Sequence, residues 1–257
     1  MKVTSGVRVP AQRAAAADAA AGAFVGMGTV FAGSTPRGWA HVRDGVGAMV
    51  TGAPVPTLNG VVCARPGAVG TAAALLDEVA ATGLPYCLET RDGDAAGEML
   101  ARSRGMTVAE RVPFMLATSV EAAAPVTVRV LGEDESDVHL DVTNAGFEAP
   151  PEVLAVFRGS DLLAREGVRG YVVEDAGVPV ATALGITGEG HVGVFNVATL
   201  RAYRGRGYGA ALTARAVADG VAAGARTAFL QSSEMGLRVY ERLGFRTVEH
   251  WTVWVGA

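Results

Sequence analysis

The sequence predicts an α+β (mixed α/β) protein made of two consecutive halves, each a mixed, mostly antiparallel sheet flanked by helices. Three observations predict this. Three apolar runs in the C-terminal half are joined by short turns, a pattern typical of hairpin-connected strands. Helix, strand, helix and strand patterns then follow, and the same order recurs more weakly in the N-terminal half. In a chain of 257 residues, each half has about 120–130 residues, a normal domain size.

Composition excludes several classes of protein. Half of the residues are apolar, and the formal net charge of −4 argues against a nucleic-acid partner. Cys63 and Cys87 both lie inside apolar runs, which indicates two buried free thiols in a reducing cytosol rather than a disulfide framework or a metal site. We therefore expect neither a metal nor a nucleic acid as a partner.

The N-terminal region is alanine-rich. The run from Ala14 to Ala21 contains Asp18, and it is typical of a helix rather than of the apolar part of a signal peptide. No uninterrupted apolar stretch reaches the roughly 18–20 residues that span a bilayer. We therefore expect a soluble cytoplasmic protein without a membrane partner.

A segment from Ala117 to Pro125 divides the chain, and we expect domains at residues 1–120 and 126–257. The second domain starts with a strand over residues 126–131, a helix from Glu133 toward Asn144, and a second helix at about Glu152–Arg165. Its later elements follow in order: strands Val168–Glu174, Val178–Ile186 and His191–Thr199, a helix ending near Gly224, strand Thr227–Gln231, helix Met235–Leu243 and strand Phe245–Val255.

The N-terminal half repeats the end of this pattern. Its elements are helix Leu75–Gly83, strand Tyr86–Glu89, helix Ala95–Gly105 and strand Val112–Leu116. Gly83 aligns with Gly224, and Gly105 aligns with Gly244. Two copies of one fold is our interpretation, and a chance recurrence of βαβ units is the alternative.

A glycine-rich turn at Arg204–Gly209 separates the strand ending at Thr199 from the following helix. Glycines allow backbone N–H groups to approach a phosphate, and a helix start adds partial positive charge. Arg204 and Arg206 add full charges. In the aligned N-terminal copy, Ala64, Pro66 and Ala68 replace the glycines, so we expect that copy not to bind a cofactor in the same way.

The run from Gly205 to Ala210 also satisfies the dinucleotide pattern G-x-G-x-x-G/A, which would suit an NAD-dependent oxidoreductase. However, it comes late, after three hairpin-connected strands, and no acidic residue lies about 20 positions further on, near Thr227. A phosphate-binding P-loop is excluded because no Gly-Lys-Ser/Thr follows.

Two motifs resemble the GNAT acetyltransferase superfamily. Arg204-x-x-Gly207-x-Gly209 is similar to its R/Q-x-x-G-x-G/A signature, and the run from Tyr240 to Phe245 is similar to its Y-x-x-x-G-F ending. The resemblance covers about 126–255, and the N-terminal half resembles the degenerate, non-catalytic partner domain of tandem GNAT proteins. It implies two tandem GNAT-like domains, the second catalytic.

The resemblance also implies a site for acetyl-CoA. The diphosphate would lie on the loop of Arg204, Gly205, Arg206, Gly207, Tyr208 and Gly209, and the pantetheine arm would lie along Val197, Ala198 and Thr199. Ser233 takes the place of an asparagine that the family often uses. Tyr240 would be the general acid that protonates the leaving thiolate, because a phenol with a reference pKa of about 10 stays protonated at neutral pH. In the N-terminal copy, Ala101 takes its place.

The residues do not identify the general base. Glu148, in a loop after the first helix of the second domain, is our first candidate, and Glu174 and His191 are others. The apolar wall of an acceptor pocket would come from Phe147, Trp251 and Trp254, although tryptophans also serve as core. We expect His139 to be a surface residue or a satisfied core residue.

The function implied is an acetyl-CoA-dependent N-acetyltransferase that acts on an amine of a small molecule or a peptide. A CoA-binding sensor without catalysis is the alternative, favoured by the missing base. We expect a monomer or a homodimer.

Overall fold

The computed structural model describes residues 8–121, 123 and 125–256, with only the backbone described for residues 8–11. It contains an 11-stranded sheet with the order β1-β2-β3-β4-β11-β5-β10-β9-β8-β7-β6. The strands are β1 Trp39–Arg43, β2 Val46–Val50, β3 Asn59–Cys63, β4 Cys87–Thr90, β5 Thr107–Ala117, β6 Arg129–Val130, β7 Val168–Asp175, β8 Val178–Gly188, β9 His191–Thr199, β10 Thr227–Gln231 and β11 Arg246–Val255. The helices are α1 Arg8–Gly33, α2 Val69–Ala80, α3 Ala95–Ser103, α4 Ser136–Gly146, α5 Tyr208–Ala222 and α6 Glu234–Arg242. The mixed, mostly antiparallel sheet flanked by helices confirms the predicted fold class.

The two halves repeat one pattern of strand pairing. In the first half β1–β2 and β2–β3 pair antiparallel and β3–β4 pair parallel. In the second half β7–β8 and β8–β9 pair antiparallel and β9–β10 pair parallel. The first hairpin of each half turns through two left-handed residues, Asp44 and Gly45 in one and Ala176 and Gly177 in the other. Both observations support the interpretation of two copies of one fold.

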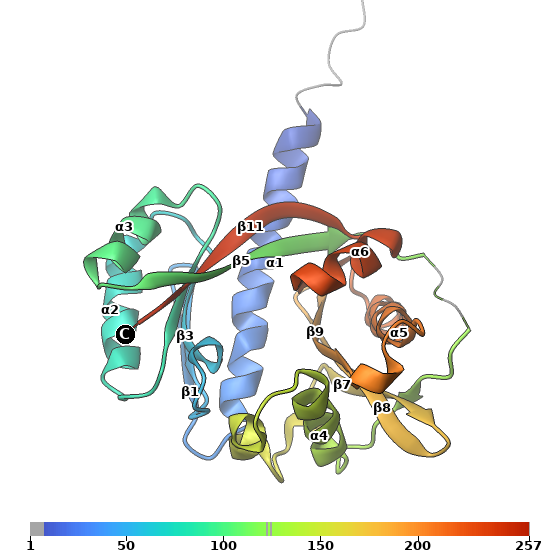
Figure 1. Cartoon of the computed structure of the whole chain (residues 1–257). Helices are drawn as coiled ribbons and strands as arrows, with labels where there is room; N and C mark the ends of the chain where they lie inside the picture. The colour runs from blue at the N-terminus through green and yellow to red at the C-terminus, as the bar shows by residue number, and fades with distance from the viewer. Residues whose placement is uncertain (1–7, 122, 124, 257) are drawn as a thin grey trace, which may run out of the picture.

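The last strand of each half pairs with the other half. β5 pairs with β10, whereas β11 pairs with β4, and β5 and β11 pair with each other over most of their length. Figure 1 shows both strands passing between the halves. A boundary near residues 120–126 therefore separates the two copies in sequence but does not separate two sheets, and the division into two domains stays a prediction. Residues 122 and 124 of the dividing segment lie outside the described residues.

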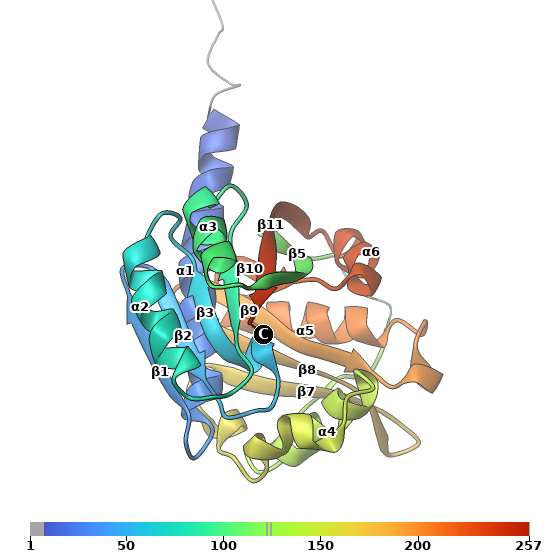
Figure 2. The same cartoon turned by 60° about the vertical axis from the view of Figure 1, so that its left-hand side comes forward.

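Helix α1 lies against the sheet between the two halves, as Figures 1 and 2 show. Its Phe24 ring contacts four aromatic rings from four different strands, with centroid distances of 5.2–6.1 Å. These rings belong to Phe114, Phe195, Phe229 and Trp251. Residues Gln12–Gly33 are long and apolar enough to cross a membrane by length and composition alone. The buried alanines, Met27 and Phe31 of α1 belong to the core, however, so this segment acts as a core helix here.

One predicted helix and one predicted strand differ from their predictions, and three strands were not predicted. The second helix expected at about Glu152–Arg165 is instead two 3-10 segments, Pro151–Phe157 and Leu162–Ala164. Gly159 between them has a φ of +63°, a left-handed conformation that ends a helix. The strand expected over residues 126–131 is reduced to β6, and strands β1–β3 of the first half were not predicted.

Candidate active site

Strands β9 and β10 separate next to the glycine-rich turn. They pair from Thr227 and His191 only as far as Phe229 and Gly193, although β9 continues to Thr199. A bulge on β9 places Asn196 at a φ of +51°, a conformation that non-glycine residues rarely adopt. The edge of β9 beyond Gly193 is therefore open toward β10, and an extended ligand can pair with it.

The turn that follows β9 presents unpaired amides. Gly205 and Gly207 have φ values of +79° and +83°, and α5 begins at Tyr208. Among the residues that the structure describes, no group accepts a hydrogen bond from the backbone N–H groups of residues 205–210. A Cβ at Gly205 or Gly207 would meet nothing within 4 Å, so the space in front of the turn is open. These amides and the helix start can bind a phosphate group.

The two arginines of the turn have different surroundings. Arg204 donates to the backbone carbonyls of Thr199 (3.2 Å) and Gly146 (2.7 Å), and so ties the turn to β9 and to the end of α4. Arg206 lies over the ring of Tyr203, 4.9 Å from its centroid, forms an ion pair with Asp175 at 3.5 Å and is half exposed. Arg204 thus shapes the turn, and Arg206 is the more exposed of the two charges.

A cavity of about 340 Å³ lies between the two halves, within the size range of small-ligand sites. The second half contributes Val197 near the end of β9, the α6 N-cap Ser233, and Tyr240 in the last turn of α6. The first half contributes α1 and the strands β2, β3 and β4, with Phe24, Met49, Val62 and Glu89. Both copies of the fold therefore form the walls of this cavity.

Tyr240 lies in the wall of the cavity on α6. It is 9% exposed, and burial raises the pKa of its hydroxyl to about 12, so it stays protonated at neutral pH. No described residue hydrogen-bonds with this hydroxyl. Gly236, one turn earlier, makes room for the ring, because a Cβ there would lie 2.7 Å from Tyr240 Cε2. The placement suits a group that donates a proton into the cavity.

Ser233 is the N-cap of α6. Its Oγ accepts a hydrogen bond from the backbone N–H of Gly236 at 3.3 Å, which fixes the start of the helix that carries Tyr240. It also lines the cavity. Ser233 therefore positions Tyr240 whether or not it contacts a ligand.

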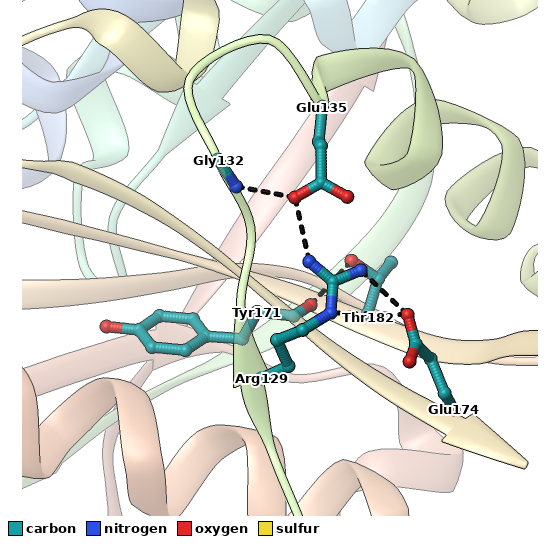
Figure 3. Close-up of polar contacts among 6 residues, drawn as sticks. All are labelled: Arg129, Gly132, Glu135, Tyr171, Glu174 and Thr182. Carbon is teal, nitrogen blue, oxygen red and sulfur yellow. Dashed lines mark hydrogen bonds and ion pairs between the residues drawn. The ribbon is translucent and has the colours of Figure 1, made fainter. Parts of the chain in front are cut away.

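The three candidate bases named from the sequence lie outside the cavity lining. Glu148 forms ion pairs with Arg204 (3.1 Å) and Arg201 (3.6 Å) beside the glycine-rich turn. Glu174 accepts from Arg129, which also binds Glu135 (Figure 3). The ring of His191 is 2.8 Å from the carbonyl oxygen of Glu189.

The other residues singled out from the sequence divide between cavity and core. Phe147 lines the cavity. Trp251 and Trp254 are buried in the core, where Trp254 Nε1 donates to Thr90 Oγ1 at 2.9 Å. His139 is a core residue 2.7 Å from Thr182 Oγ1, and burial lowers its pKa to about 3, so it is neutral. Cys63 and Cys87 are free and buried, as predicted.

Glu89 is a cavity residue that the sequence analysis placed in a strand but did not consider functionally. It is 7% exposed, and Gln231 Nε2 donates to its Oε2 at 2.8 Å. Burial raises the pKa of Glu89, the Gln231 hydrogen bond lowers it, and nearby Glu110 raises it again, with a net increase. The only signal in the sequence was an acidic residue ending the otherwise apolar run from Tyr86.

We expect Glu89→Gln to stabilise the protein increasingly as the pH rises. Because the folded-state pKa of Glu89 lies above its unfolded value, its contribution to stability is complete below the unfolded pKa and is lost as the pH rises through the folded pKa. Glutamine cannot ionise and keeps the contact with Gln231. Melting temperatures at pH 5 and pH 8.5 should show a higher value for the variant at pH 8.5 and a smaller gap at pH 5. Exposed Glu152→Gln is the control, and a gap that does not change with pH would contradict the prediction.

The second half of the chain matches a known protein family. Residues 138–245 match the model of the acetyltransferase (GNAT) family. No curated protein matches the sequence. A GCN5-related N-acetyltransferase from Kribbella flavida has a similar structure, with a TM-score of 0.66, 21% identity, and coverage of 92% of this chain and 95% of the other.

Two further structures have similar folds. One is described as a putative acetyltransferase from the GNAT family of Novosphingobium aromaticivorans (TM-score 0.56, 21% identity, 84% and 90% coverage). The other is a tandem GNAT protein from the clavulanic acid biosynthesis pathway (TM-score 0.54, 15% identity, 92% and 94% coverage). Residues 138–245 of the chain are therefore similar to the acetyltransferase (GNAT) family, and over most of its length the chain has a fold similar to that of a tandem GNAT protein.

Proposed function

We propose that this protein is an acetyl-CoA-dependent N-acetyltransferase whose acceptor is an amine of a small molecule or a peptide. The observation that carries the proposal is the continuity of the site. Unpaired amides at residues 205–210 are followed by the open edge of β9, and that edge leads to a cavity lined by Tyr240. A diphosphate, an extended arm and a reacting group suit these three parts in that order.

The residues that would hold acetyl-CoA are those of the turn and the strand. Backbone amides from Gly205 to Gly209, together with Arg206, would bind the diphosphate, and Arg204 would keep the turn in place. The edge at Val197, Ala198 and Thr199 would pair with the pantetheine arm. When bound, acetyl-CoA supplies a thioester carbonyl that an amine can attack and a sulfur that can leave.

Tyr240 has the role of general acid in this proposal. Its hydroxyl is protonated and has no protein partner to compete for its proton among the described residues, and Tyr240 lines the cavity. It gives that proton to the leaving sulfur. A backbone N–H of the β9 bulge near Val197 is the proposed donor to the developing oxyanion, since Val197 lines the same cavity.

The first half is proposed not to bind acetyl-CoA on its own turn. At the position equivalent to the glycine-rich turn, the carboxylate of Asp94 accepts hydrogen bonds from the backbone N–H groups of Gly67 (3.2 Å) and Gly97 (3.1 Å). A buried negative charge of the protein itself thus lies where a phosphate would bind. The first half contributes cavity wall instead.

Mixing the protein with acetyl-CoA and a library of amines, while following free thiol and the mass of the acetylated product, tests the proposal. We expect thiol release that depends on the amine and an equal amount of N-acetylated product. Tight CoA binding without product from any amine would favour the sensor, and preference for NAD(H) over CoA in a competition titration would favour an oxidoreductase. A cytoplasmic location and a monomer or homodimer belong to the same proposal.

A further inference from the structure

Two carboxylates lie in one row across the sheet at the cavity. Val62 on β3 is paired with Glu89 on β4, Glu89 with Val253 on β11, and Val253 with Glu110 on β5. Paired residues on neighbouring strands share a face, so these side chains lie on the same side of the sheet. All four line the cavity. Glu89 and Glu110 therefore flank Val253 in the cavity wall, Glu89 buried and Glu110 exposed.

Glu89, the buried carboxylate of this pair, has one oxygen that accepts no hydrogen bond from the described residues. Glu89 Oε2 accepts from Gln231, but no described residue donates to Oε1. No Lys or Arg lines the cavity within the described residues, and so this carboxylate has no cationic partner there. A buried carboxylate without a cation is costly unless a ligand supplies one. An ammonium group, with three donors and a positive charge, would satisfy it.

We propose that Glu89 of the first half binds the reacting amine of the acceptor, with Glu110 as a second carboxylate at the mouth of the site, so that the acceptor is a cationic amine. This inference rests on the proposed function. Glu89 then also serves as the base: the N–H bond of the bound ammonium breaks, its electron pair stays on nitrogen, and the proton forms an O–H bond with Oε1. The neutral amine is the nucleophile that the transfer requires.

A second, mostly apolar cavity next to the first can hold the part of the acceptor that does not react. This cavity of about 220 Å³ shares Phe31, Thr57, Leu58, Phe147 and Asn196 with the first. Its other lining residues are mostly apolar, and most of them come from α4 and the 3-10 segments that follow it. An amine with an aromatic or aliphatic body therefore fits better than a small hydrophilic one.

The test measures binding of 2-phenylethylammonium to the full chain by calorimetry, with 3-phenylpropanoate as an anion of similar shape. We expect the ammonium probe to bind at least about tenfold more tightly than the anion. Glu89→Gln should weaken the ammonium probe by about tenfold or more, and Glu110→Gln should weaken it less because that side chain is exposed. Glu152→Gln, a change of an exposed glutamate outside the cavity, should have no effect.

The pH dependence gives a second readout. Affinity for the ammonium probe should rise as Glu89 ionises, since its raised pKa keeps it protonated at lower pH. Among the described residues that line the cavity with Glu89, the other titratable groups are Glu110 from β5, Cys87 from β4 and Tyr240 from α6, whereas β10 and β11 contribute the uncharged Gln231 and Val253. In Glu89→Gln this rise should be lost.

Three results would overturn the inference: no binding of the ammonium probe, equal binding of the anion, or unchanged ammonium binding in Glu89→Gln. The comparison of the two probes uses the unaltered protein and does not depend on how a variant folds. CoA binding is measured separately. If CoA binds and Glu89→Gln has no effect on the amine, only this inference fails. If CoA does not bind, the proposed function fails, although the amine site can still be present.

Discussion

Gly207→Glu is expected to abolish CoA binding, with a loss of more than about 100-fold in affinity. Gly207 is the N-cap of α5 and has a φ of +83°, where a side chain costs about 1–2 kcal/mol. The larger effect is electrostatic, because the new carboxylate would stand among the free amides and repel a diphosphate. Because a Cβ at this position meets nothing within 4 Å, the variant should still fold. Calorimetric titration with CoA measures the loss.

Gly83→Glu is the matched control for this change. Gly83 also has a positive φ, +70°, and a Cβ there would also meet nothing within 4 Å. The two variants therefore carry the same strain and the same added charge, and their melting temperatures should fall by similar amounts. Only Gly207→Glu should lose CoA. If Gly207→Glu binds CoA as the unaltered protein does, the glycine-rich turn is not the diphosphate site.

Tyr240→Phe is expected to lower turnover by about 10²–10⁴-fold, the usual contribution of a positioned general acid. The phenyl ring keeps its packing against Phe245, whose ring centroid is 6.1 Å away, and it keeps the space made by Gly236. The hydroxyl has no protein partner among the described residues, so its removal leaves no orphaned group. Affinity for CoA should stay within about threefold, because in the proposed site the diphosphate and the pantetheine arm would contact other residues.

Tyr171→Phe separates this effect from the general cost of removing a buried hydroxyl. Tyr171 is 1% exposed and its hydroxyl donates to Asp219 at 3.2 Å, outside the cavity. That variant should lose about 1 kcal/mol of stability with turnover nearly unchanged. Steady-state rates of thiol release and thermal melts compare the two variants. Turnover within about twofold of normal in Tyr240→Phe would remove Tyr240 from the acid role.

The glycine-rich turn and the helix of Tyr240 could be predicted because their signals are local. Gly205 and Gly207 allow backbone angles that other residues rarely adopt, and Ser233 caps α6 through a neighbouring amide. The predicted strands of the second half, from β7 to β11, also agree closely with the observed ones, since their apolar runs are bounded by turn residues. In these cases a prediction from one element and its flanks was sufficient.

The candidate base named from the sequence, Glu148, does not line the cavity, and there is a physical reason for this. Glu148 was chosen because its loop follows the first helix of the second domain, but nearby Arg204 and Arg201 pair with it there. Glu89 is brought to the cavity by the parallel pairing of β3 with β4 and by the exchange of the last strands. Its contact with Gln231 joins residues 142 positions apart.

The sequence by itself determined the local chemistry of this protein: the fold class, the turn with free amides and the tyrosine on the following short helix. Only the tertiary structure decided that the last strand of each half pairs with a strand of the other half. It also decided which carboxylate lines the cavity. Strand pairing uses backbone groups that every residue carries, so the choice between β4 and β10 as the partner of β11 leaves no distinct local pattern. The burial of Glu89 is a consequence of that pairing, and it gives the first half a wall, and by our inference a catalytic group, in the site of the second.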